Sequence, residues 1–268
     1  LKGDVIKIMD DVHVKAENGA TTNSLSLYTG RYRTESGAAF TEITDKAINI
    51  NAPTFLEYLG GTHTVKYVPN GEQHTLTCGC GLLTAQNLPH NWEAEGSCQD
   101  CEAQAKLSVS DGTDTRCFVT PEAAVRAWTE GTTLKLLDHV TNPGDLAMLT
   151  VSSPDCALEL NSKTISGYYF FVNQDLTVKG PGKIISANGN ETIYLNTDAK
   201  LTVDGGAAIE NTAGKAVGNY AGGMILKNGT LIGDTVAYSG QNFTAESGTI
   251  QGDLYLAENC FLSGKVTI

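Results

Sequence analysis

Four cysteines and a histidine lie close together in the first half of the chain. Cys78 and Cys80 form a Cys-x-Cys pair, His90 follows, and Cys98 and Cys101 form a Cys-x-x-Cys pair. Each pair places two sulfur ligands on one turn, and the loop between the pairs can bring them around one ion. Because zinc binds thiolate and imidazole side chains in this way, the spacing predicts a structural zinc site at these five residues.

Other interpretations of this segment stay open. Residues 71–108 are too few to bury much apolar surface, so a metal or covalent links must hold them together. His74 is a further imidazole that can replace a thiolate. In an exported protein, disulfides between the two cysteine pairs would serve the same purpose, and free thiols are the third interpretation.

A pattern of short strands and turns recurs in the second half of the chain. The apolar residues that follow successive turns are Ile165, Ile184, Ile209, Leu231, Ile250 and Val266. They are 19, 25, 22, 19 and 16 residues apart, and a period of about 20 residues indicates a β-solenoid. Alternate apolar residues would point inward and stack, with Leu158 and Leu160 over Leu176 and Val178. Cys156 falls at such an inward position.

A helix is expected at 121–130, just before the repeat. Thr120 suits its N-cap, Pro121 its first position and Gly131 its C-terminus. We expect Trp128 in the core and the helix over the open end of the first coil. The predicted fold class is all-β: a right-handed parallel β-helix with a capping helix.

The chain thus divides into three predicted parts. Residues 1–70 form a β-rich segment, interpreted as the end of a preceding solenoid plus a cap, with a short helix at 53–59. Residues 71–108 form a zinc-ribbon-like Cys/His module, and 109–268 form the β-helix. Strand-like sequence at both ends predicts that the chain continues into further modules of a longer protein.

Composition restricts the partners. The chain has 18 Lys and Arg against 30 Asp and Glu, a formal net charge of −12. No basic stripe is available to neutralise phosphates, so nucleic acid is not an expected partner. No apolar run approaches the roughly 18 residues that a membrane helix requires, so membrane insertion is not expected either.

The sequence gives little support to an enzyme. Parallel β-helices include pectate lyases and polygalacturonase-like hydrolases, which carry sets of catalytic residues on successive coils. Here Asn196-Thr-Asp198 is not followed by the Asp-Asp, Gly-His-Gly or Arg-Ile-Lys motifs of the hydrolases, and Asp10-Asp11 lies far upstream. No arginine follows Arg126. A β-helix polysaccharide lyase or hydrolase is therefore the second hypothesis, and a structural spacer the third.

Two segments resemble a known family. Residues 120–137 and 156–167 look like the β-helix domains of very large modular surface proteins of gut Gram-positive bacteria, with Glu159 for the usual Asp and Ser162 for the usual Gly. The Cys/His segment at 78–101 is similar to small inserts between such modules. The resemblance implies a secreted or wall-attached, extracellular location and no particular ligand.

The first hypothesis for function is a non-enzymatic binding or adhesin segment. Its partner would be a host protein, immunoglobulin among them, or a mucosal glycan. Tyrosine supplies a large contact area at low entropic cost. The candidate contact residues are Tyr168, Tyr169, Tyr194, Tyr220, Tyr238 and Tyr255.

Overall fold

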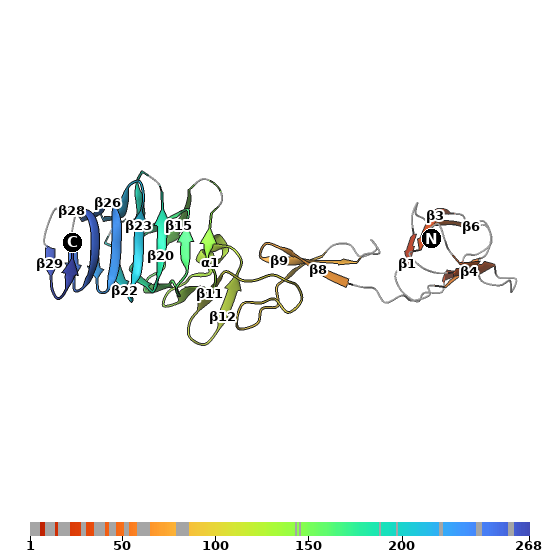
Figure 1. The fold of residues 1–268 in the computed structure, drawn as a ribbon. Helices are drawn as coiled ribbons and strands as arrows, with labels where there is room; N and C mark the ends of the chain where they lie inside the picture. Colours follow the sequence, from red (N-terminus) through yellow and green to blue (C-terminus); the bar gives the residue numbers. More distant parts are fainter. Residues whose placement is uncertain are drawn as a thin grey trace. The chain divides into compact units, whose positions relative to one another are not determined.

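The computed structural model describes the strands within residues 1–64, and residues 65–78 and 86–268. The exceptions are 143, 145, 188, 197, 220–221, 240–242 and 257–259, and the side chains of 1–65, 78, 86, 219, 235–239, 256, 260 and 262. The chain forms two compact units, Leu1–Leu88 and Pro89–Ile268 (Figure 1).

The first unit consists of strands. They are β1 (Ile6–Ile8), β2 (Val14–Lys15), β3 (Thr22–Leu27), β4 (Arg31–Thr34), β5 (Thr41–Glu42), β6 (Ala47–Ile50), β7 (Thr54–Glu57), β8 (Val65–Asn70) and β9 (Gln73–Cys78). The helix expected at 53–59 is wrong, because Thr54–Glu57 within it form β7, which pairs antiparallel with β4. Antiparallel pairing with a neighbouring strand outweighs the weak local helix preference. β8 and β9 form a hairpin, and β10 (Gln86–Pro89) lies beside β9 in the same sheet.

The second unit is a parallel β-solenoid of about five turns, as predicted. Each coil contributes a strand to each of three faces. The first face contains β13 (Thr133–Leu136), β16 (Cys156–Glu159), β19 (Leu176–Lys179), β22 (Lys200–Asp204), β25 (Gly223–Leu226), β27 (Phe243–Ala245) and β29 (Cys260–Leu262). Figure 1 shows these coils side by side from α1 to β29.

The other two faces belong to one continuous sheet. The second face contains β14 (Val140–Thr141), β17 (Thr164–Ser166), β20 (Gly182–Ser186), β23 (Ala207–Asn211) and β30 (Val266–Thr267). The third face contains β15 (Ala147–Val151), β18 (Tyr168–Val172), β21 (Glu191–Leu195) and β24 (Lys215–Asn219). The long strands β26 (Gly229–Ser239) and β28 (Gly248–Leu256) turn from the second face to the third.

Inward columns of apolar side chains form the core. Ile165, Ile184, Ile209, Leu231 and Ile250 pair in sequence from coil to coil and are at most 1% exposed. The first four predicted steps of the repeat are therefore confirmed. The last step is wrong, because Val266 pairs with Gly248.

The predicted stacking of the first face is shifted by two residues. Cys156 and Leu158, rather than Leu158 and Leu160, lie over Leu176 and Val178. Leu160 is fully buried at the corner after β16. The chain turns there through Asn161 and Ser162, which have positive φ angles of 49° and 60°. Strand β16 therefore ends at Glu159, and the Leu160 amide makes the last bond to the next coil, to the Lys179 carbonyl at 2.8 Å. Cys156 fills the core as expected, at 2% exposed.

The N-terminal end of the solenoid is covered by a helix and a hairpin. Helix α1 spans Pro121–Ala127, and the Thr120 side chain accepts a hydrogen bond from the Ala123 amide. The helix is shorter than predicted, because Trp128 already has extended backbone and Gly131 belongs to the turn before β13. Trp128 is 4% exposed and donates from Nε1 to the Thr132 carbonyl at 3.1 Å.

A hairpin that the sequence analysis missed completes this end. Strands β11 (Leu107–Ser110) and β12 (Thr115–Phe118) pair antiparallel, and β11 also pairs antiparallel with β13. The outer edge of the first face is therefore closed by a strand of opposite direction. Helix α1 contacts both strands of this hairpin and β15.

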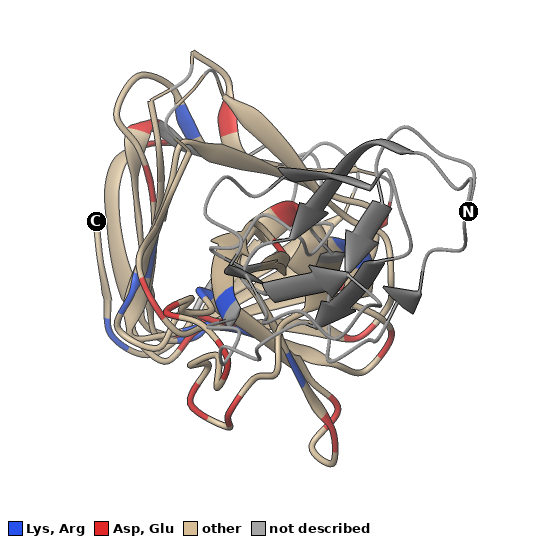
Figure 2. Cartoon of the chain, turned by 90° about the vertical axis from the view of Figure 1, so that its right-hand side faces the viewer, with Lys and Arg blue, Asp and Glu red and all other residues tan. Residues whose placement is uncertain are grey.

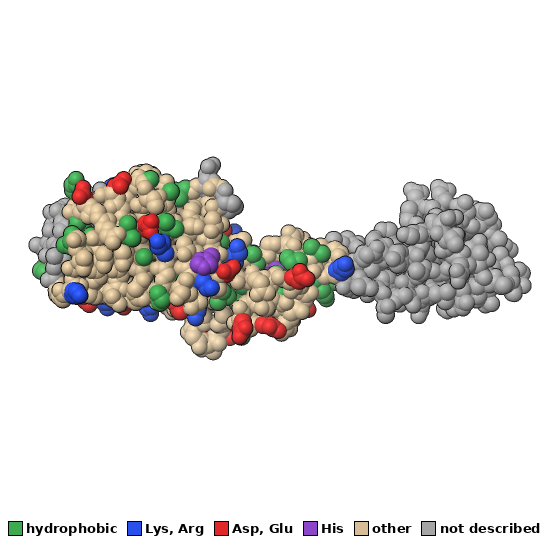
Figure 3. Space-filling model, in the orientation of Figure 1, with side chains coloured by type: hydrophobic (Ala, Val, Ile, Leu, Met, Phe, Trp, Pro, Cys, Tyr) green, Lys and Arg blue, Asp and Glu red, His purple; other side chains and the backbone are tan. Residues whose placement is uncertain are grey.

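The outer surface of the solenoid carries interspersed charges (Figure 2). Opposite charges pair between neighbouring coils, as in Lys135–Glu159 at 3.3 Å and Lys183–Glu210 at 2.7 Å. The face seen in Figure 3 is largely neutral and polar, with scattered apolar side chains. Among the described residues, no helix is long and apolar enough to cross a membrane.

Candidate metal centre and aromatic column

A compact loop after β10 places the Cys-x-x-Cys pair beside His90. A bridge pairs Trp92 with Cys98, and the Cys98 amide donates to the Ala103 carbonyl at 3.0 Å. These backbone bonds close a tight turn around Cys98 and Cys101. The Cys101 sulfur then lies 3.5 Å from Nδ1 of His90.

His74, from β9, completes a group of four. The ligand atoms of His74, His90, Cys98 and Cys101 all lie within 4.8 Å of one another. Within the described part of the chain, these four side chains form a group that could hold a metal ion, with two imidazoles and two thiols as ligands. Three of its members were predicted ligands, and His74 was the imidazole expected to replace a thiolate.

The other predicted ligands are not placed by the structure. Cys80 lies outside the described residues, and of Cys78 only the backbone in β9 is described. Among the described residues, Cys98 and Cys101 carry thiols and form no disulfide with each other. The spacing of the cysteines was the signal for the loop, but no spacing rule identifies His74 as the preferred partner.

Aromatic side chains surround the group, and its two histidines are buried. The His74 ring packs against Tyr67 with centroids 4.7 Å apart, and the His90 ring against Trp92 at 4.4 Å. His74 is 2% exposed and His90 8%. Burial raises the pKa of the Cys101 thiol, and a hydrogen bond with the neighbouring Cys98 raises it further, although a backbone bond at Ala103 acts in the opposite direction.

One distance within the group matches the spacing of ligands around a tetrahedral ion. With metal–ligand bonds of about 2.0–2.3 Å, neighbouring ligand atoms of a tetrahedral site lie about 3.5 Å apart. The Cys101–His90 separation of 3.5 Å matches this. Nitrogen and sulfur ligands are the set that selects zinc over the hard cations.

A second feature is a column of aromatic residues on the third face. Successive register positions of β15, β18, β21, β24, β26 and β28 hold Thr150, Phe171, Tyr194, Gly218, Tyr238 and Tyr255. We call Phe171, Tyr194, Tyr238 and Tyr255 the aromatic column. Neighbouring strands of a sheet lie about 4.8 Å apart, so the column follows the solenoid axis.

The described members of the column lie at the surface. The rings of Phe171 and Tyr194 stack with centroids 5.1 Å apart and planes 6° from parallel. Both are half-buried, whereas Tyr255 is 56% exposed. For Tyr238 the strand position is described but not the side chain.

The other predicted contact residues behave differently. Tyr168 is wrong as a contact residue, because it is 5% exposed and belongs to the inward side of β18. Burial, together with the charge of the Glu122 carboxylate and a hydrogen bond to it, raises the pKa of Tyr168 to about 12. Tyr169 is half-buried and pairs with Met148, outside the column. Tyr220 lies outside the described residues.

Phe171 is the member that the sequence analysis missed. Side chains alternate along a strand, so adjacent residues such as Tyr168 and Tyr169 cannot share a face. With Tyr168, Phe170 and Val172 inward, Phe171 must point outward with Tyr169. The alternation within 168–172 was the signal that could have identified it.

Comparison with known proteins provides no relative. No family model matches this chain, and no curated protein and no solved structure matches it at a significant level. Its function has to be inferred from the sites themselves, because a solenoid fold is compatible with many functions.

Proposed function

We propose that the solenoid is a non-enzymatic binding segment of a secreted or cell-surface protein, and that it recognises a host protein, such as immunoglobulin, or a mucosal glycan. The observation that supports this proposal is the aromatic column. A spacer has no need for aromatic residues in register on one outer face. The resemblance of 120–137 and 156–167 to bacterial surface proteins favours the extracellular location.

The column is suited to recognition because it is preorganised. The stacked rings of Phe171 and Tyr194 restrict each other's rotation, so little side-chain entropy remains to be lost on binding. Tyr255 offers an accessible ring with a hydroxyl at its tip. Tyrosine combines apolar contact with hydrogen bonding, which suits both sugar rings and protein surfaces.

Capture from natural sources tests this function. The immobilised chain would be exposed to mucosal secretions and serum, with retained proteins identified by mass spectrometry, and in parallel to a panel of glycans. We expect one saturable partner whose retention falls in a Tyr194→Ala, Tyr255→Ala double variant. Phe261→Ala, at an exposed ring on β29 of the first face, is the matched control.

Two outcomes would contradict the proposal. A partner retained equally by the double variant and the unchanged chain would place recognition elsewhere. Absence of any partner, together with cleavage of a polysaccharide by the unchanged chain, would support the lyase or hydrolase hypothesis. Absence of both would leave the spacer.

We further propose that the group of His74, His90, Cys98 and Cys101 holds a structural zinc ion. Four protein ligands leave no position for a reactive water, so the ion would stabilise the loop rather than catalyse a reaction. The thiols must lose their protons on binding, and the binding free energy becomes folding free energy of a segment with little core. When bound, zinc supplies the positive charge that favours two neighbouring thiolates.

Metal analysis of single variants distinguishes the two ligand sets. For the four-residue group we expect about one zinc per chain, lost in Cys98→Ser and Cys101→Ser and retained in Cys78→Ser and Cys80→Ser. Loss of zinc in the latter two variants would instead support the ligand set predicted from spacing. A chain purified without any zinc, and unaffected by added zinc in its thermal unfolding, would contradict the proposal.

A further inference from the structure

Among the described strands, the first coil has one sheet edge without a neighbouring strand. On the first face, β13 is covered by the antiparallel strand β11. On the third face, β15 is the last strand of its sheet and, within the part of the chain that the structure describes, pairs with β18 alone. Edge strands of this kind present unpaired backbone groups to which another extended chain can bind.

The hydrogen bonds between β15 and the neighbouring coil show which backbone groups of β15 face outward. The Ala147 amide donates to the Gly167 carbonyl at 3.3 Å, and the Val151 carbonyl accepts from the Asn173 amide at 2.9 Å. In a parallel pair, both backbone groups of a residue point to the same side, and successive residues alternate. Since Ala147 and Val151 point to β18, the N–H and C=O groups of Met148 and Thr150 point to the outer edge.

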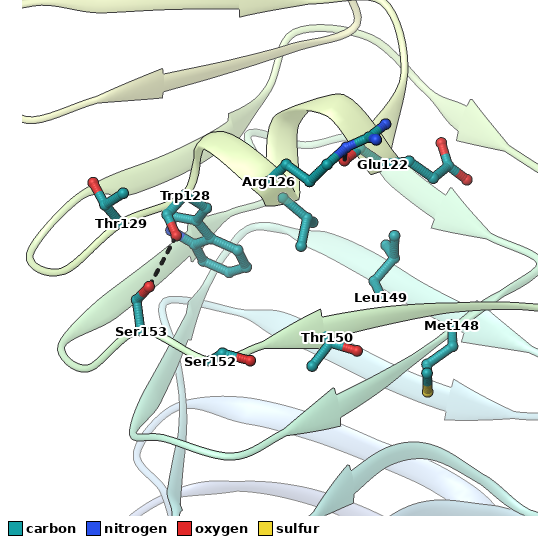
Figure 4. Close-up of a pocket in the computed structure, with 10 residues that line it drawn as sticks. Glu122, Arg126, Trp128, Thr129, Met148, Leu149, Thr150, Ser152 and Ser153 are labelled. Atoms are coloured by element: carbon teal, nitrogen blue, oxygen red, sulfur yellow. Dashed lines mark hydrogen bonds between the residues drawn. The ribbon is translucent and has the colours of Figure 1, made fainter.

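A groove of about 450 Å³ runs along this edge, between β15 and α1 (Figure 4). It is lined by Glu122, Val125, Arg126, Trp128 and Thr129 on the helix side, and by Met148, Leu149, Thr150, Ser152 and Ser153 on the strand side. Met148 is 51% exposed although it is apolar. The groove is lined by three successive residues of β15, Met148, Leu149 and Thr150. Since successive side chains point to opposite faces, the edge of the strand borders the groove.

We propose that this groove binds an extended peptide segment of a partner protein, which adds a strand to the outer edge of β15. A peptide backbone is the ligand whose donors and acceptors repeat with the spacing of Met148 and Thr150. The added strand would continue the parallel sheet, with alternate side chains towards the apolar groups of Val125 and Leu149. Glu122 and Arg126 provide one charge of each sign for polar side chains of the segment.

This site does not depend on the aromatic column. The column uses outward side chains of later coils, whereas strand addition uses main-chain groups of the first coil. Either can fail without the other, and the variants below separate them.

The test selects binders from a displayed library of short random peptides with the intact chain as bait. Thr150→Pro removes one outer N–H and leaves the ladder to β18, because proline is tolerated at an edge position whose N–H faces outward. We expect selected peptides to bind Thr150→Pro about tenfold more weakly, the effect of one lost hydrogen bond, and Thr150→Ala normally. Tyr255→Ala should have no effect on them.

A second measurement applies whether or not Thr150→Pro folds. Methylation of each peptide amide in turn should weaken binding at every second position, because only alternate amides face β15. The bound peptide should also slow hydrogen exchange at the Met148 and Thr150 amides. Selection of no peptide, binding insensitive to Thr150→Pro, uniform sensitivity to methylation, or a glycan that competes for the groove would each overturn the proposal.

Discussion

Truncation of one inward leucine measures how the columns stabilise the solenoid. Leu158 is fully buried and stacks between Leu134 and Val178 in the first face. Replacement by alanine removes apolar contacts and leaves a cavity that the rigid coils above and below cannot close. Such substitutions cost 2.7–5.0 kcal/mol in well-packed cores, and we expect about 3 kcal/mol for Leu158→Ala.

Thermal and urea unfolding provide the assay. For a unit of this size, about 1 kcal/mol lowers Tm by about 2–4 °C, so Leu158→Ala should lower it by about 6–12 °C. The control is Glu159→Ala at the next, outward position, where an exposed ion pair with Lys135 is lost. That change should cost less than about 1 kcal/mol. Equal effects of the two substitutions, or no change in Tm for Leu158→Ala, would refute inward packing at this register.

Three further predictions follow from the structure. Cysteines introduced at Thr177 and Thr202, which pair directly, should form a disulfide on mild oxidation, whereas a Thr177 and Asp204 pair, offset by two residues, should not; peptide mapping would show this. The free energy of unfolding should fall as pH rises. Burial raises the pKa of Cys156 to about 11, so its effect begins above about pH 9. The pKa of Tyr168 is raised to about 12, so its effect begins above about pH 10. Both groups keep their protons longer in the folded state, so stability is complete below the unfolded pKa and is lost towards the folded one; a flat stability between pH 9 and 12 in urea titrations would contradict this. A zinc chelator should speed hydrogen exchange in the loop at 90–105, because the bound ion stabilises this loop, and should leave hydrogen exchange in the last coils unchanged.

The repeat could be predicted well because its physics is local. Each coil needs apolar residues inside and a permissive corner, and both are visible in the sequence as a period. Register is harder. A shift of two residues, as between Leu158 and Leu160, preserves the inward face and therefore leaves the apolar pattern unchanged. The turn at Asn161, which has a positive φ angle, sets where β16 ends. The period of apolar residues does not reveal this turn.

The candidate sites depended on longer-range information. Cysteine spacing identified the loop around Cys98 and Cys101, but the approach of His74 depends on how β9 lies in its sheet. Similarly, the tyrosines were recognised as a group, whereas their division between core and surface follows from strand alternation. The alignment of Tyr194 with Tyr255 requires the register of several coils with loops of unequal length.

The most direct test of the central claim is the affinity of the captured partner for the chain and for Tyr255→Ala. Tyr255 is the most accessible described residue of the aromatic column, and its loss leaves the core columns intact. If the column is the binding surface, Tyr255→Ala should raise Kd by about tenfold or more, as expected for an aromatic contact residue. Phe261→Ala, at an exposed ring outside the column, should leave Kd unchanged. Equal Kd values for the unchanged chain and Tyr255→Ala would contradict the account.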